Sequence, residues 1–373
     1  MRRIKQTITD NLYNIPGWKT KRHILVIESD DWGSIRMPSV EVYERLLKQG
    51  VRFGTYGYEH YDTIASPKDL QDLFEICVSE KDSKGRPVIV TANCVMANPD
   101  FDRIRQSEFN EYFYEPITAT MNRYYPNADL ISLWKEGIDS KVFKPQLHGR
   151  EHVNAQMWLN SLRQKHKGVR EAFDEGVFSI LVSKEEDSRI KNTTAFKSLS
   201  EEEKPFYDKA INDAVSMFKK MFGYAPKSFI PPAFCWDYDI EKALAKEGIE
   251  SIQGIAMHFE KGKRQFRKIG QITPSGLINL VRNASWEPTQ EYGKDVNGIC
   301  LKQIETAFRW NKPATISAHR LNFIGALHKE NREQNLILFK ELLTDIKKTW
   351  PDVEFMSSDE LGEQIAKEKC QKS

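Results

Sequence analysis

The feature that most constrains this chain is the stretch Ile24–Trp32, which reads ILVIESDDW. A short run of largely β-branched apolar residues is typical of a buried strand in a parallel sheet. The run leads into two adjacent carboxylates, Asp30 and Asp31, and α/β folds place their chemistry at the carboxyl ends of such strands. Neighbouring carboxylates repel each other unless a cation or a proton separates them. The sequence therefore predicts a chemically active pair at the mouth of a sheet or barrel.

Strand-like and helix-like segments alternate along most of the chain. We predict strands at 23–29, 87–95, 141–147, 178–182, 227–231, 251–255, 277–281, 314–318 and 353–356. Amphipathic helices are expected at 40–48, 70–78, 130–137, 201–222 and 331–349. This alternation predicts an α/β fold in which helices cover a parallel sheet that is closed or nearly closed.

Composition narrows the classes of function. The 373 residues include 55 basic and 53 acidic side chains, and this balance gives no electrostatic footprint for nucleic acid. No window approaches the ~18 apolar residues of a membrane span, and the N-terminus lacks the apolar segment of a secretory signal. The five cysteines form no CxxC pair, as expected for reduced thiols. We therefore predict a cytoplasmic protein of enzyme size.

A metal site is predicted from Asp31, His148 and His152. His148 follows a predicted strand, as Asp31 does, and His152 comes four residues later. Catalytic zinc sites use three such ligands and keep a fourth position for water. Histidines at i and i+4 share one face if their segment is helical. The expected cofactor is one divalent ion, zinc by default, with cobalt or nickel able to substitute, and Asp30 is then free to take a proton from the water.

Further candidates follow other strand ends. His319 comes directly after the predicted strand 314–318 and suits a general acid, although it can equally be a hydrogen-bonded core histidine. Candidates for contacts with the substrate are Arg150, Pro232, Phe234, Trp236, Trp286 and Arg320. The aromatic members can wall a groove, and the arginines can hold a carboxylate. The alternatives are core packing for the aromatic residues and a solvent-facing position for the arginines.

The order of these motifs resembles that of polysaccharide deacetylases of the NodB-homology group, carbohydrate esterase family 4. The resemblance spans about 24–361 and implies a distorted (β/α) barrel of about seven parallel strands with helical and loop insertions. It implies a divalent metal, held by Asp31, His148 and His152, and hydrolysis of N- or O-acetyl groups on a sugar substrate. Asp30 would be the base and His319 the acid. We expect one domain over 1–373, with its core at 22–365 and insertions at 154–224 and 257–273, and the polar stretch 184–204 at the surface.

The chain departs from the family in two motifs. The family's Arg-Pro-Pro-Tyr-Gly-like motif appears as IPPAF at 230–234, without the arginine that steadies the catalytic aspartate. If the missing arginine is functionally replaced, a guanidinium should lie within hydrogen-bonding distance of Asp30, and Arg150 and Arg320 are the candidates. The Asp-x-x-Asp-Trp motif has no recognisable counterpart, and residues 283–286 stand in its place without the aspartates.

Two other functions remain open at this stage. One is a carbohydrate-binding protein on the same barrel that has lost turnover, an alternative motivated by the missing arginine. The other is a metal-free glycosidase that uses two carboxylates such as Asp30 and Glu287, which leaves His148 and His152 without a role. Metal content separates the deacetylase from the glycosidase, and turnover on acetylated sugars separates it from the binding protein.

Overall fold

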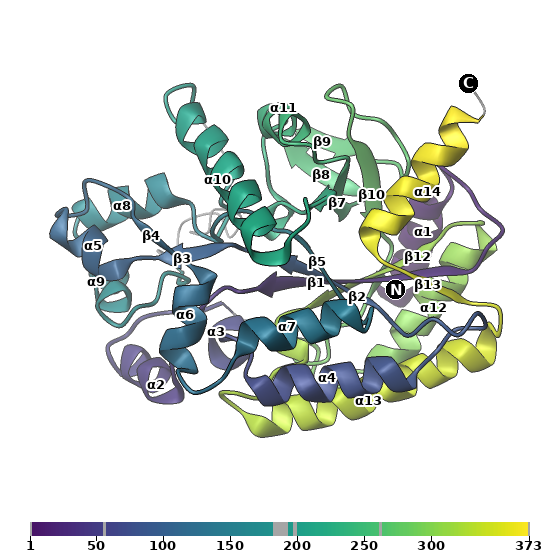
Figure 1. The fold of residues 1–373 in the computed structure, drawn as a ribbon, viewed down its shortest axis with the longest axis horizontal. Coiled ribbons are helices and arrows are strands. Elements are labelled where there is room, and N and C mark those ends of the chain that lie inside the picture. Colours follow the sequence, from purple (N-terminus) through teal and green to yellow (C-terminus); the bar gives the residue numbers. More distant parts are fainter. Residues whose placement is uncertain (1, 55–56, 182–192, 197–199, 261–262, 372–373) are drawn as a thin grey trace.

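The computed structural model describes residues 2–54, 57–181, 193–196, 200–260 and 263–371. Its main sheet runs in the order β10-β7-β6-β5-β2-β1-β12-β11, with β13 also paired to β1, and every pairing is parallel. Figure 1 shows helices on both sides of the labelled strands of this sheet. The strands are β1 (Ile24–Trp32), β2 (Val90–Cys94), β5 (Phe143–Leu147), β6 (Ser228–Phe229), β7 (Ser251–Ile255), β10 (Ile278–Arg282), β11 (Ala284–Ser285), β12 (Ala314–His319) and β13 (Glu354–Met356). Two antiparallel hairpins pair β3 (Ala97–Pro99) with β4 (Tyr114–Pro116) and β8 (Met257–Glu260) with β9 (Lys263–Phe266).

The sheet closes on itself almost completely. Its two end strands, β10 and β11, are separated along the chain by Asn283 alone, whose N–H donates to the carbonyl of Thr315 in β12. The result is a nearly closed barrel of eight parallel strands surrounded by helices, which confirms the prediction of a distorted (β/α) barrel. The two-residue β11 is the strand of this sheet that no predicted segment covers, because so short a strand carries too little pattern to be recognised.

Helices fill the connections between the strands. They are α1 (Arg2–Asn14), α2 (Val40–Lys48), α3 (Tyr58–Tyr61), α4 (Pro67–Ser79), α5 (Phe101–Gln106), α6 (Ile117–Tyr124), α7 (Leu130–Asp139), α8 (Ala155–Arg163), α9 (Lys167–Asp174), α10 (Lys204–Phe222), α11 (Asp239–Lys246), α12 (Val296–Arg309), α13 (Lys329–Thr349) and α14 (Ser358–Cys370), with 3₁₀ turns η1 (Pro232–Phe234) and η2 (Arg320–Asn322). The five predicted helices are all present. Local signals fix their starts: Ser39 caps α2, and Ser66 forms a capping box ahead of Pro67 in α4.

One strand prediction is wrong. Residues 178–181 are irregular, and Val182 lies outside the described residues. Phe178 packs into a secondary apolar cluster, while Ser179 donates to the carboxylate of Glu59 instead of joining a ladder. A short apolar run of this kind cannot be told from a buried loop by periodicity alone. Of the polar stretch 184–204, residues 184–192 and 197–199 also lie outside the described part.

The face of β1 that carries Asp30 changes character along the strand. Ile24 and Val26 pack in an apolar cluster with Leu361 and Ile365 of α14, whereas Leu25 and Ile27 belong to the large core that also includes residues of α4, α7 and α13. The hydroxyl of Ser358, the first residue of α14, donates to Glu28, so this strand face is apolar at its start and acidic at its end. Because side chains alternate between the two faces of a strand, Glu28 and Asp30 share this face and lie near its carboxyl end.

No helix in the described part of the chain is long and apolar enough to cross a membrane. The two segments expected as insertions contain α8, α9 and α10 in one case and the β8–β9 hairpin in the other.

Candidate functional site

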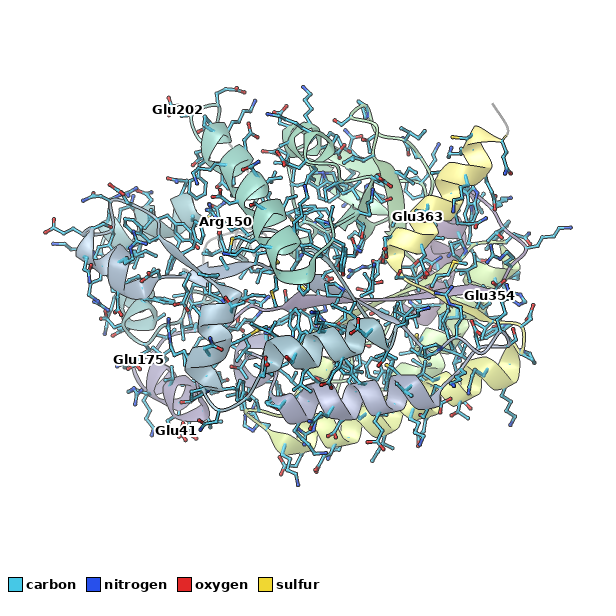
Figure 2. All side chains as sticks on the ribbon, in the orientation of Figure 1. Glu41, Arg150, Glu175, Glu202, Glu354 and Glu363 are labelled. Atoms are coloured by element: carbon cyan, nitrogen blue, oxygen red, sulfur yellow. The ribbon has the colours of Figure 1, made fainter. Side chains whose placement is uncertain are left out.

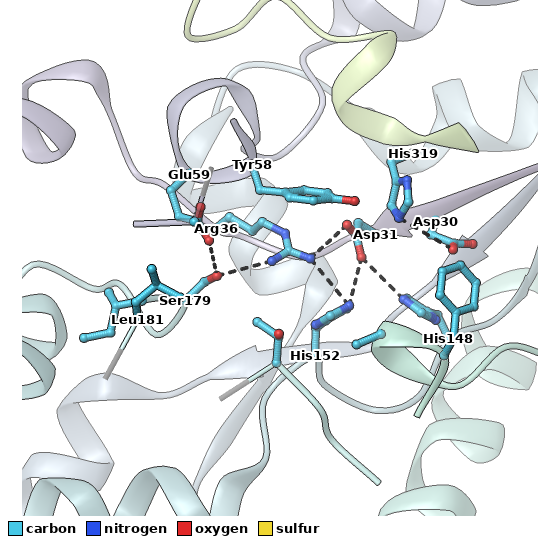
Figure 3. A pocket seen from close by; sticks show the side chains of 15 residues that line it. Asp30, Asp31, Arg36, Tyr58, Glu59, His148, His152, Ser179, Leu181 and His319 are labelled. Carbon is cyan, nitrogen blue, oxygen red and sulfur yellow. Dashed lines mark hydrogen bonds and ion pairs between the residues drawn. The ribbon is translucent and has the colours of Figure 1, made fainter. Parts of the chain in front are cut away.

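Asp30 and Asp31 both line one cavity of about 160 Å³ (Figure 3). Neighbouring residues of a regular strand point to opposite faces, so this arrangement needs a break in β1. The break is visible in the backbone: Asp31 has φ 73°, and the pairing of β1 with β2 shifts register between Ser29 and Trp32. Aspartate tolerates the left-handed region better than most residues do, and a bulge re-aims a side chain. Both carboxylates therefore reach the same space.

His148 and His152 also line this cavity, but a loop and not a helix brings them there. His148 follows the last residue of β5, and the chain then turns at Gly149, whose φ is 104°. The positive φ strains any other residue at this position, and a Cβ there would also make a tight contact of 3.3 Å with the Phe196 ring, so the backbone favours glycine. The two imidazoles thus converge without a helical face, because the loop directs both of them into the cavity.

Asp31, His148 and His152 offer a buried set of ligand atoms that lie within 4.8 Å of one another. Asp31 Oδ1 is 3.0 Å from His152 Nε2 and 3.4 Å from His148 Nε2. His148 Nδ1–H donates to the Ile230 carbonyl at 2.8 Å, so its Nε2 carries a lone pair toward Asp31. Asp31 Oδ1 and His148 Nε2 have no hydrogen-bond partner among the described residues. Buried acceptor atoms that face one another in this way fit a divalent cation.

The charge states of these groups suit a metal. Burial disfavours the charged form of Asp31, but Arg36 and His152 outweigh it and hold the pKa of Asp31 well below its usual range. Burial, with a contribution from Arg36, lowers the pKa of His152 to about 4 against the pull of Asp31. The set therefore presents one carboxylate and a neutral imidazole at neutral pH, the forms that coordinate metals.

Asp30 is held apart from this set by Arg282, the last residue of β10. Its guanidinium forms a fork on the carboxylate, with Nη2 2.7 Å from Oδ1 and Nη1 2.8 Å from Oδ2. Asn93 Nδ2 donates to Oδ1 at 2.8 Å, and Arg282 Nε donates to Glu28. Although burial opposes ionisation, Arg282 lowers the pKa of Asp30 below its usual value. Asp30 is therefore an oriented carboxylate at neutral pH.

His319, at the end of β12, lies on the other side of Asp30. Its Nε2 is 3.9 Å from Asp30 Oδ2, and its Nδ1 is 2.6 Å from Glu287 Oε1. Burial alone would lower the pKa of His319, but the Glu287 carboxylate, aided by Asp30 and Asp31, raises it to about 9. The imidazole is thus protonated at neutral pH and lines the same cavity as the aspartates.

Other residues of the wall come from loops, from the short helix α3 and from the 3₁₀ turn η1. Arg36, Tyr58, Ser179, Ala233 and Phe234 line the cavity, and Figure 3 shows the Tyr58 hydroxyl directed toward the space between Asp31 and His319. Ala233 and Phe234 have φ values of 56° and 54°, so two consecutive residues of this loop are left-handed. Such backbone costs energy and is concentrated at functional sites.

Of the six residues predicted to contact substrate, only Phe234 lines the cavity. Arg150 pairs with Glu151 and with Asp213 of α10, and Figure 2 shows Arg150 next to this helix. Arg320 is fully buried and pairs with Asp62.

The other three predicted contacts are buried in the structure around the cavity. Pro232 begins η1, the Trp236 indole donates to Glu241, and the Trp286 indole donates to Asn297. Core packing, the alternative considered for the aromatic residues, therefore describes Trp236 and Trp286.

The expectation that Arg150 or Arg320 stands beside Asp30 is also wrong, because Arg282 takes that place. Arg282 was detectable in the sequence: it directly follows the predicted strand 277–281, and strand ends had already yielded Asp30, His148 and His319. Arg36 and Tyr58 carry no comparable signal, since they lie in loops and a short helix between β1 and α4.

Comparisons with known proteins reveal distant similarities. The family model for glycosyl hydrolase family 57 matches residues 162–254. No curated protein sequence matches the chain. Among solved structures, a probable polysaccharide deacetylase from Pseudomonas aeruginosa is similar, with 9% identity, coverage of 92% of this chain and 91% of that one, and a TM-score of 0.48.

Two further structures are similar to the chain. A putative polysaccharide deacetylase from Mycobacterium smegmatis has 9% identity, coverage of 95% and 94%, and a TM-score of 0.42. A 4-α-glucanotransferase from Thermococcus litoralis has 9% identity and a TM-score of 0.46. The match covers 91% of this chain but 40% of the transferase. None of these similarities assigns the chain to a family.

Proposed function

We propose that the chain is a metal-dependent hydrolase that removes N- or O-acetyl groups from a sugar or polysaccharide precursor. The observation that carries the proposal is the convergence on one cavity of three kinds of group. These are the buried ligand set of Asp31 with two histidines, the ionised Asp30, and the protonated His319. Metal-assisted acyl hydrolysis needs a metal site, a base and an acid in this proximity.

Asp31, His148 and His152 would hold one divalent ion, with zinc as the expected metal. When bound, the ion supplies a polarised acyl carbonyl and a water of lowered pKa, near 7 for zinc. Asp30, fixed by the Arg282 fork, would accept a proton from the attacking water. His319 donates a proton to the departing amine or alcohol, and the backbone N–H of Ala233 on the cavity wall is the proposed donor to the oxyanion.

Two alternatives remain as outcomes of the test. A carbohydrate-binding protein without turnover would keep the ion yet leave acetylated sugars intact. The glycosidase alternative uses Asp30 and Glu287, but it leaves the buried set of Asp31, His148 and His152 without a role. The region matched by the glycosyl hydrolase model contains neither carboxylate.

The experiment compares metal content and deacetylation of an acetylated amino-sugar oligomer for unmodified protein, Asp31→Asn and Asp30→Asn. Asp31→Asn should lose the ion and activity together, because it removes a ligand. Asp30→Asn should keep the ion and lose a factor of about 10²–10⁴ in turnover, the usual contribution of a positioned base. If Asp30→Asn loses the ion and Asp31→Asn keeps it, the two roles are reversed. If the unmodified protein binds no ion, the hydrolase mechanism fails.

A further inference from the structure

Arg36 is a buried cation placed directly against the ligand set. It lies in the loop after β1, and its side chain is 6% exposed. Its Nη2 donates to Asp31 Oδ2 at 2.9 Å and lies 3.5 Å from His152 Nε2. A positive charge beside a cation site is unfavourable to metal binding by itself. Its presence therefore calls for a role other than raising metal affinity.

Contacts with Asp62 and Ser179 hold the Arg36 side chain in this position. Its Nε lies 3.1 Å from Asp62 Oδ2, and its Nη1 donates to Ser179 Oγ at 3.3 Å. Asp62 is itself buried and accepts two hydrogen bonds from Arg320, the residue that follows His319. The line Asp31–Arg36–Asp62–Arg320 thus ties the end of β1 to the end of β12. Moving Arg36 would leave a buried carboxylate with an incomplete set of partners, which is costly.

The contact divides the two oxygens of Asp31 between different partners. Oδ2 accepts from Arg36, while Oδ1 faces the two imidazoles and accepts no hydrogen bond among the described residues. Free carboxylates bind cations through one oxygen or through both. A catalytic zinc site keeps three protein ligands and an open position, and a second oxygen from the same carboxylate would take up that position.

We propose that Arg36 is a positioning residue that confines Asp31 to one oxygen toward the metal and so keeps a coordination position open. This inference rests on the proposed metal site. The guanidinium charge of Arg36 opposes the ion and so lowers the metal affinity, whereas its hydrogen bond to Asp31 keeps one coordination position open. Removing Arg36 should therefore raise the affinity for the ion and add one oxygen to its coordination shell, the opposite of what loss of an ordinary supporting contact would do.

The test uses full-length protein freed of metal and then loaded with Co²⁺. X-ray absorption counts the oxygen neighbours, visible absorption reports the coordination number, and competition with a chelator gives the affinity. Arg36→Met should gain one oxygen neighbour, show weaker visible absorption and bind Co²⁺ more tightly. Arg36→Lys keeps a charged donor and should resemble the unmodified protein. Arg332→Met is the matched control, because Arg332 forms a buried pair with Asp69 and does not line the cavity.

The possible results separate this inference from the proposed function. If the unmodified protein binds no Co²⁺, the metal site fails. If it binds Co²⁺ but Arg36→Met shows the same oxygen count, or a lower affinity that Arg332→Met also shows, the role of Arg36 is refuted while the metal site stands. A crystal structure of the unmodified Co²⁺ protein with both Asp31 oxygens on the ion would refute it even if Arg36→Met did not fold.

Discussion

Replacing Glu287 by glutamine should lower the pKa of His319 and with it the protonated fraction of the proposed acid. The pKa of about 9 lies well above the ordinary value of 6.5, a difference of about 3 kcal/mol in free energy. Part of this comes from Asp30 and Asp31. An opposite charge in direct contact accounts for about 1–3 units, and Glu287 lies 2.6 Å from Nδ1. We expect the substitution to lower the pKa by that amount.

The substitution should strongly lower the protonated fraction of His319 at neutral pH. At pH 7.5 a pKa of about 9 keeps about 97% of His319 protonated, whereas a pKa of about 7 keeps about 24%. The free energy of unfolding should also depend on the protonation of His319. Because the folded pKa of His319 is raised, its contribution is complete below about pH 6.5 and is lost as the pH rises through about 9. Glu287→Gln should therefore lower the free energy of unfolding by about 1–4 kcal/mol at pH 6, and by much less at pH 10.

The assay is an NMR titration of the imidazole Cε1 protons in metal-free protein, so that no bound cation perturbs His319. The chain has eight histidines, and the His319 resonance is assigned by its absence in His319→Asn. Denaturant unfolding at pH 6 and pH 10 measures the stability. Glu291 lies in the same loop and pairs with Lys294, so Glu291→Gln is the control and should leave the pKa of His319 unchanged. A pKa near 6.5 in the unmodified protein, or an unchanged pKa in Glu287→Gln, would refute the reasoning.

Two further substitutions test other parts of the site. Arg282→Met leaves Asp30 as a buried carboxylate without its cation, and we expect a loss of about 3–5 kcal/mol in denaturant unfolding at pH 7. The loss should shrink as the pH falls and Asp30 becomes protonated, since the low pKa of Asp30 stabilises the fold only above its titration range. A loss that does not vary with pH would contradict the pairing. Gly149→Ala forces a side chain into a left-handed position and should cost about 1–3 kcal/mol and weaken metal binding. Unchanged thermal unfolding and metal content would show that the loop between His148 and His152 adapts freely.

The sequence predicted the cavity-lining residues that follow strands. Asp30, Asp31, His148 and His319 each come at or just after the end of a parallel strand, and the ends of parallel strands meet at one mouth whatever the loops do. The apolar runs in the sequence were enough to locate β1, β5 and β12, the three strands that carry these residues. The prediction therefore did not depend on whether the segment containing His148 is helical.

Residues in the loops could not be placed in this way. Arg36 and Tyr58 depend on the path of the chain between β1 and α4, which no periodic pattern specifies. Arg320 shows the reverse difficulty: it adjoins His319 but pairs with Asp62 in the interior and does not line the cavity. Which of two neighbouring residues enters a site is decided by local backbone geometry. At Asp31 that geometry includes a positive φ, which no pattern in the sequence indicates.

The seam between β10 and β11 has a consequence for how a site of this kind can change during evolution. Arg282 and Glu287 stand five positions apart on the segment that closes the barrel, and one sets the ionisation of Asp30 while the other sets that of His319. One short stretch of chain therefore sets the ionisation of both the proposed base and the proposed acid. Substitutions in this stretch would shift both limits of the working pH range together and leave unchanged the residues proposed to hold the metal.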